Sequence, residues 1–123
     1  MYGLRMANTG GDVSFMNGVA ELLVLRLLSR GEMYGYEIVR AIAESTGGVI
    51  AVGEGCVYPI LHAMEKKRWV ASRRRKLDGR TRIYYRLTDA GSGRLQVASA
   101  RWSEISAAVS AALKATHVPE PAL

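Results

Sequence analysis

An Asp-Gly pair at positions 78 and 79 separates two runs of eight residues in which the side chains alternate in character with a period of two. The tight turn that such a pair favours needs positive φ at both central residues. The runs Val70–Leu77 and Arg80–Leu87 therefore predict a β-hairpin with a two-residue turn. A turn of that length fixes the register, which pairs Leu77 with Arg80, Lys76 with Thr81, Arg75 with Arg82, Arg74 with Ile83, Arg73 with Tyr84 and Val70 with Leu87.

This register sorts the hairpin into two faces. Near the base, one face is suited to cover a hydrophobic core and holds Val70, Ser72, Tyr85 and Leu87. The opposite face is basic and holds Arg73, Arg75, Arg80, Arg82, Tyr84 and Arg86, whereas Arg74 and Lys76 lie on the first face near the tip. Like charges across a hairpin repel by a few tenths to about 1 kcal/mol per pair. Stability alone is therefore not expected to place Arg75 opposite Arg82, and a polyanion would make the arrangement favourable. A solvated hairpin without a ligand is the alternative.

The positive charge of the chain is concentrated at this hairpin. Ten of the 17 lysines and arginines lie between Lys66 and Arg86, where Asp78 is the only acid, and the formal net charge is +6. This balance favours an acidic partner. The length of 123 residues, 49% of them hydrophobic, suits one globular domain.

Three helical segments precede the hairpin. Apolar residues recur at helical spacing from Met16 to Arg30 and from Tyr34 to Ser45, where Gly47-Gly48 ends the pattern. A third helix is expected to begin between Glu54 and Val57 and to run to about Lys67, because Pro59 is tolerated only near the first turn.

A longer helix follows the hairpin. Thr88 is suited to cap it, and Asp89 falls in the positively polarised first turn. About 25 residues give it a length of about 38 Å, more than a small domain needs for its own core. A heptad seam on this helix predicts a dimer interface made of Leu95, Ala98, Trp102, Ile105, Val109 and Ala112.

The order of the elements predicts a mainly α fold with a small β-hairpin, namely a winged helix-turn-helix followed by a long C-terminal dimerisation helix. We expect a flexible N-terminal tail over residues 1–15, the winged helix-turn-helix over 16–87, the dimerisation helix over 88–115 and a flexible tail over 116–123. Met16 is an alternative to Met1 as the natural start.

Catalysis, metal binding and membrane insertion are not expected. No Ser-His-acid set or carboxylate pair occurs, His62 and His117 do not form a metal site, and Cys56 is the only cysteine. We therefore expect that the protein is not an enzyme and that it binds neither a cofactor nor a metal ion. The longest apolar run, Gly18–Leu28, is about half a membrane span, and no secretory signal opens the chain, so a cytoplasmic location is expected.

Three segments carry a family resemblance. They read YGYEI from Tyr34, GEGCVYPILH from Gly53 with Met64-Glu65 after it, and GRTRIYYRLT from Gly79 with Ala90-Gly91 after it. Together they resemble the PadR family of transcriptional regulators, over about Met16 to Leu113. The resemblance implies a homodimeric winged-helix protein that binds double-stranded DNA, in most members as a repressor. The length of this chain resembles that of the family's compact branch, whose members have a single C-terminal dimerisation helix.

The resemblance also implies a DNA-binding surface. It places Tyr34 near the DNA backbone and Glu54, Gly55, Cys56, Tyr58 and His62 at or near the groove-facing part of the third helix. Tyr58 is alternatively a core aromatic residue. Because the first turns of this helix lack the Arg or Asn side chains that read bases, phosphates and DNA shape are expected to dominate. The hairpin contributes Arg73, Arg75, Lys76, Arg80 and Arg82.

Two single residues have alternative interpretations. Trp102 is an anchor of the dimer interface or, by resemblance to multidrug-sensing members of the family, a residue that stacks on a small aromatic effector. Cys56 is a small half-buried residue or a redox-sensitive thiol with a lowered pKa. A further alternative for the basic hairpin is binding of RNA regardless of sequence.

Overall fold

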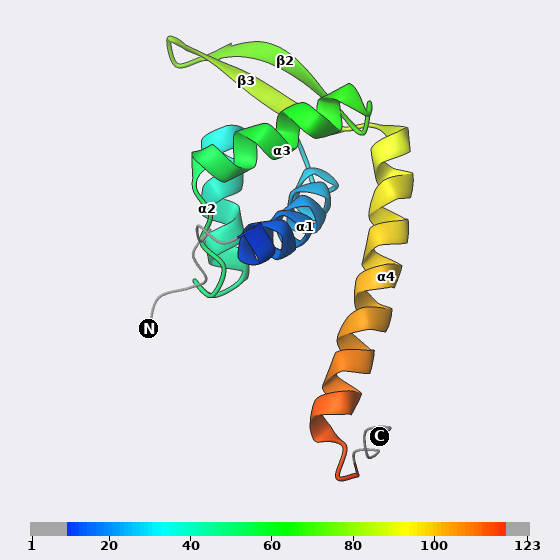
Figure 1. The fold of residues 1–123 in the computed structure, drawn as a ribbon. Helices are drawn as coiled ribbons and strands as arrows, with labels where there is room; N and C mark the ends of the chain where they lie inside the picture. The colour runs from blue at the N-terminus through cyan, green and yellow to red at the C-terminus, as the bar shows by residue number, and fades with distance from the viewer. Residues whose placement is uncertain (1–9, 118–123) are drawn as a thin grey trace.

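The computed structural model describes the backbone of residues 10–117 and the side chains of residues 18–117. Along the chain it contains α1 (Gly10–Leu28), β1 (Met33–Tyr34), α2 (Gly35–Ser45), α3 (Glu54–Lys66), β2 (Val70–Leu77), β3 (Arg80–Leu87) and α4 (Asp89–Lys114). Helices α1, α2 and α3 pack together below the β2–β3 hairpin, whereas α4 leads away from this body along one side (Figure 1). The predicted winged helix-turn-helix with a long C-terminal helix is confirmed.

The hydrophobic core lies where the three helices meet. Each helix presents an apolar stripe inward, and the base of the hairpin closes the core with Val70 and Tyr85, which are 2% and 3% exposed. Burying one such apolar side chain stabilises the fold by about 1.5–3 kcal/mol. The fully buried helical side chains include Val24, Leu25, Ile38, Ile42, Val57 and Leu61.

The hairpin has the predicted register, with Leu77 opposite Arg80 and Val70 opposite Leu87. Asp78 and Gly79 have φ values of 51° and 77°, as the predicted turn requires. A short strand was not predicted. Strand β1 pairs with β3 and makes a three-stranded antiparallel sheet in the order β1-β3-β2.

Helix α1 begins six residues before its expected start at Met16, so residues 10–15 are helical rather than part of a tail. The sequence lacks an apolar period there, and Gly10-Gly11 are poor helix formers. The expected tails over residues 1–9 and 118–123 lie outside the described residues.

The start of α4 is fixed against the preceding loop. The Gly91 amide donates to Thr88 Oγ1 at 3.0 Å, which is the predicted cap, and the Thr88 amide donates to the Trp69 carbonyl at 3.0 Å. Further along α4, Arg94 Nη2 lies 3.4 Å from Glu21 Oε1 of α1, and its guanidinium lies 4.9 Å from the centre of the Trp69 ring. These contacts set the direction in which α4 leaves the body. None of the described helices has the length and hydropathy of a membrane span.

Candidate nucleic-acid interface

Helix α3 presents its N-terminal end to solvent. Glu54, Gly55 and His62 are exposed, whereas Cys56 and Tyr58 are half-buried. Helix α3 starts after Gly53, which has extended backbone geometry and caps it. Its first amides have no partner four residues earlier in the helix, so they are suited to bind an anion.

Tyr58 connects α3 to α2. Its ring packs against the backbone of Gly35, where a Cβ atom would lie only 2.7 Å from Cε1 of the ring. The same ring lies 6.2 Å from the His62 ring, measured between centroids. Tyr58 is therefore a packing residue at the α2–α3 contact, whose partly exposed ring adjoins the exposed His62.

Cys56 packs at the edge of the core and is half-buried. Burial raises the pKa of its thiol above the ordinary value, because the charged thiolate loses solvation. The predicted alternative of a lowered pKa is therefore wrong, and the interpretation as a small half-buried residue is confirmed.

Tyr34 stands at the junction of β1 and α2. Its amide donates to Glu37 Oε1 at 3.1 Å, which caps the start of α2. Its ring meets the ring of Tyr84 on β3 edge to face, with centroids 5.3 Å apart. The Arg82 guanidinium lies over the Tyr34 ring at 4.5 Å. Tyr34 thereby joins the hairpin to the first turn of α2.

Glu32 lies beneath the basic face of the hairpin and was not predicted to take part. Arg73 donates to it through Nε at 2.7 Å and through Nη2 at 2.9 Å, and Arg75 Nη1 donates at 3.0 Å. The hydrogen bond from Arg73, together with the positive charges of Arg73 and Arg75, lowers the pKa of the Glu32 carboxyl, so Glu32 is ionised at neutral pH.

The pairing of Arg75 with Arg82 is compensated within the chain. The Arg75 guanidinium lies over the Tyr84 ring at 4.5 Å and donates to Glu32, while Arg82 lies over Tyr34. These contacts offset the repulsion that was expected between the two arginines, so the pairing by itself is weaker support for a polyanion than the sequence suggested. Sequence patterns offered no signal for Glu32, because the acid lies 41 residues before Arg73.

The tip of the hairpin keeps its basic groups in solvent. Arg74, Lys76 and Arg80 are exposed, and none of them forms an ion pair with a residue between 18 and 117. Closer to the base, the Ser72 hydroxyl donates to Glu65 Oε2 of α3 at 2.6 Å. The hairpin is thus attached to α3 at its base and offers free cations at its tip.

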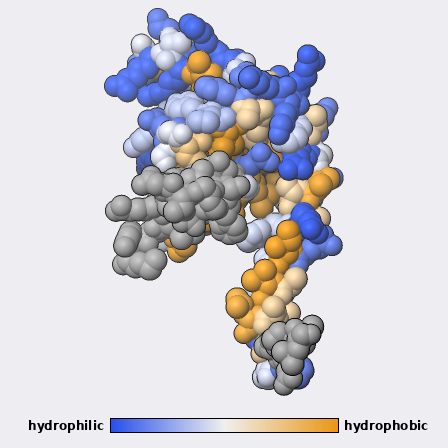
Figure 2. Space-filling model, viewed as in Figure 1, coloured by the Kyte–Doolittle hydropathy of each residue, from blue (hydrophilic) through white to orange (hydrophobic). Residues whose placement is uncertain are grey.

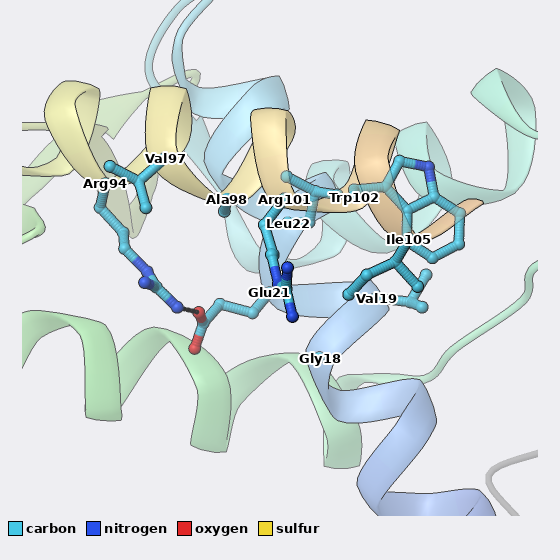
Figure 3. Close-up of a pocket in the computed structure, with 10 residues that line it drawn as sticks. All are labelled: Gly18, Val19, Glu21, Leu22, Arg94, Val97, Ala98, Arg101, Trp102 and Ile105. Atoms are coloured by element: carbon cyan, nitrogen blue, oxygen red, sulfur yellow. Dashed lines mark hydrogen bonds and ion pairs between the residues drawn. The ribbon is translucent and has the colours of Figure 1, made fainter. Parts of the chain in front are cut away.

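The predicted seam of α4 divides into two parts. Leu95 and Ala98 are half-buried, whereas Trp102, Ile105, Val109 and Ala112 are exposed, the first three of them by 44%, 42% and 52%. An apolar stripe along α4 contrasts with the hydrophilic hairpin (Figure 2). The upper end of the stripe borders a groove of about 550 Å³ between α1 and α4. Trp102, Ile105 and Val19 lie together at one end of this groove, and the Arg94–Glu21 ion pair lies at the other (Figure 3).

Among the side chains of residues 18–117, no group of three His, Cys, Asp or Glu residues is arranged to hold a metal ion.

Residues 24–97 match the sequence profile of the transcriptional regulator PadR-like family. The chain belongs to this family. The matched segment contains the helix-turn-helix, the whole hairpin and the start of α4.

Individual relatives agree with this assignment. A PadR-like transcriptional regulator from Bacillus cereus has a solved structure with a TM-score of 0.73, 30% sequence identity, and coverage of 83% of this chain and 98% of its own. The transcriptional regulator YqjI of Escherichia coli is 32% identical over 59 residues, which are 48% of this chain but only 28% of YqjI. An uncharacterised protein of Lysinibacillus sphaericus is 30% identical over 91 residues, 73% of this chain and 84% of its own.

This PadR-like protein is a transcriptional regulator of the DNA-binding winged-helix type. Its family and its structural neighbours are regulators and not enzymes, in agreement with the sequence. The exposed end of α3 and the free cations of the hairpin lie on the part of the chain that the family shares.

Proposed function

We propose that the protein is a homodimeric repressor that binds a pseudo-palindromic DNA operator. The observation that carries this proposal is the exposed N-terminal end of α3 beside a hairpin whose tip residues Arg74, Lys76 and Arg80 have no ion-pair partner between residues 18 and 117. Helix α3 enters the major groove with Glu54, Gly55 and His62, and Cys56 and Tyr58 flank that surface. The hairpin acts as a wing on the backbone or in the minor groove.

Phosphate contacts supply most of the affinity in this proposal. The exposed wing cations neutralise phosphates and release condensed counterions. The amides at the start of α3 and the Tyr34 hydroxyl are suited to bind further phosphates. Since the first turns of α3 carry no Arg or Asn, DNA shape contributes to the choice of sequence.

Dimerisation through α4 supplies the second recognition helix. The 26-residue helix exposes Trp102, Ile105, Val109 and Leu113, the last by 82%, which is a large apolar surface to leave in water. A second copy that covers this stripe with its own α4 removes it from water. The two α3 helices then read half-sites about one helical turn, roughly 34 Å, apart.

The affinity for duplex DNA is expected to fall steeply with salt, with a log–log slope of about −0.9 per neutralised phosphate. Replacing Arg74 and Arg80 with alanine is expected to make the slope shallower by about one for each phosphate that the variant no longer neutralises. Fluorescence anisotropy with a labelled promoter fragment at several salt concentrations measures both slopes. Lys114→Ala removes one charge at the far end of α4 and serves as the control.

A flat slope in the wild-type protein would contradict DNA binding through the wing. Competition with unlabelled duplex DNA and with unlabelled duplex RNA tests the alternative of RNA binding regardless of sequence. A protein that binds any nucleic acid through charge alone releases the labelled DNA equally to both competitors.

A small aromatic effector is a second candidate function, favoured by the groove between α1 and α4. Trp102, Ile105, Leu22 and Val19 give it an apolar lining large enough for a planar ring system. In a Trp69→Phe background, planar aromatic compounds are expected to quench Trp102 fluorescence in a saturable way. No response across a varied panel would contradict this function, and Trp102→Phe with Trp69 retained controls for unspecific quenching.

A further inference from the structure

The arginines on the basic face of the wing differ in the groups that their guanidinium N–H donors contact. Arg73 donates to Glu32 through Nε and Nη2. Arg75 donates to the same carboxylate through Nη1, and the carbon of its guanidinium group lies over the Tyr84 ring. The Glu32 side chain is only 17% exposed, whereas that of Arg73 is 61% exposed. Several of the N–H groups that a phosphate would need are thus already engaged within the protein.

Arg82 is held without using its hydrogen-bond donors. The carbon of its guanidinium group lies over the Tyr34 ring, 4.5 Å from the ring centre, so a contact between a cation and an aromatic ring holds this side chain. Within residues 18–117 no hydrogen bond or ion pair involves its side chain. The guanidinium N–H groups of this half-buried side chain therefore have no acceptor among residues 18–117 and can donate to an anion.

One short segment contacts both strands of the wing. Glu32 holds β2 through Arg73 and Arg75, while Tyr34, two residues later, holds β3 through Tyr84 and Arg82. Between and beside these contacts, β1 is hydrogen-bonded to β3, and the segment leads directly into α2. The wing is thereby fixed to the helix that packs against α3.

We propose that Glu32 is a positioning residue. By binding Arg73 and Arg75, it acts as a brace that fixes the position of the wing relative to α3. On the basic face of the wing, Arg82 is then the arginine that contacts phosphate. The inference rests on the proposed DNA binding and deepens it. Arg73 and Arg75 then act through Glu32 and Tyr84, whereas Arg82 and the tip residues touch the DNA.

The substitution Glu32→Gln tests this proposal, because a positioning role and a purely electrostatic role predict opposite changes in the affinity for DNA. If Glu32 were only a negative charge near a polyanion, its neutralisation would raise the affinity for every duplex. If it positions the wing, the affinity for a preferred sequence falls by about two- to thirtyfold, the range of residues that act without touching the ligand. The probes are a duplex that the wild-type protein selects from a random pool and a scrambled duplex of the same composition.

The ratio of the two affinities is the decisive readout, since added positive charge acts on both duplexes equally. Glu44→Gln makes the same chemical change in an exposed ion pair with Arg40 on α2 and is expected to leave the ratio unchanged. A thermal melt monitored by circular dichroism establishes that each variant is folded. An unchanged ratio with a higher affinity for both duplexes would overturn the proposal.

A second comparison does not depend on the Glu32 variant. Arg82→Ala is expected to make the salt slope shallower by about one, whereas Arg73→Ala is expected to leave the slope unchanged and to lower the affinity for the selected duplex. An equal decrease in slope for both variants would show that Arg73 contacts phosphate directly. If the wild-type protein itself selects no sequence or shows no salt dependence, the proposed DNA binding fails instead.

Discussion

Replacing Gly91 with alanine is expected to lower the free energy of unfolding by about 1–3 kcal/mol, the usual cost of inserting a methyl group into a filled space. A Cβ atom at Gly91 would collide with the Trp69 carbonyl oxygen and would lie 2.7 Å from Leu87 Cδ1 and 2.9 Å from the Trp69 carbonyl carbon. Two of these three atoms belong to the backbone, which cannot rotate aside as a flexible side chain does.

The collision also strains the junction that starts α4. The Thr88 cap and its backbone bond to Trp69 involve the same few residues, and loss of an N-terminal cap costs about 1 kcal/mol by itself. Urea denaturation, followed by circular dichroism at one fixed protein concentration, measures the change. The concentration must be fixed because association stabilises a folded chain.

Gly93→Ala is the matched control on the same helix. A Cβ atom at Gly93 would have no neighbour within 4 Å, so alanine there gains helix propensity without a collision. It is expected to raise the free energy of unfolding by up to about 1 kcal/mol. If the two substitutions change the free energy of unfolding in opposite directions, packing against Trp69 decides the effect at Gly91. A change in the same direction for both would contradict this explanation.

The parts of the fold that the sequence predicted are those with local signals. Asp78-Gly79 fixes a turn that only a few residue types accept, and the turn fixes the register of every pair behind it. Thr88 marks the start of α4 for a similarly local reason. Strand β1 has two residues, too few for any period to show, and it exists because β3 offers an edge for it to pair with.

The electrostatics of the wing could not be predicted from the sequence, because they depend on contacts with residues that are distant along the chain. Counting charges between Lys66 and Arg86 treats all ten cations alike. The fold distinguishes them, because it brings Glu32 to two arginines and aromatic rings to Arg75 and Arg82. The groove-facing residues of α3 were expected from the family resemblance, whereas the packing of Tyr58 on Gly35 required knowledge of how α2 and α3 meet.

The double substitution Trp102→Ala with Ile105→Ala is expected to weaken the proposed dimer by about a thousandfold or more, since central aromatic and aliphatic anchors contribute about 2 kcal/mol or more each. Both side chains lie on the predicted seam and are 44% and 42% exposed in the single chain. Neither belongs to the core that α1, α2 and α3 form, so the fold of each protomer is expected to persist. Light scattering across a dilution series measures the change in mass.

A matched control uses the opposite side of the same helix. Gln96 and Ser103 are exposed and lie off the seam, so their joint replacement with alanine keeps the number of substitutions and is expected to leave the dimer intact. Because each DNA half-site binds one protomer, loss of the dimer also lowers the affinity for a two-site operator more than the affinity for a single half-site. An unchanged mass for the Trp102 and Ile105 variant at all concentrations would refute α4 as the dimer interface and, with it, the operator geometry that depends on two α3 helices.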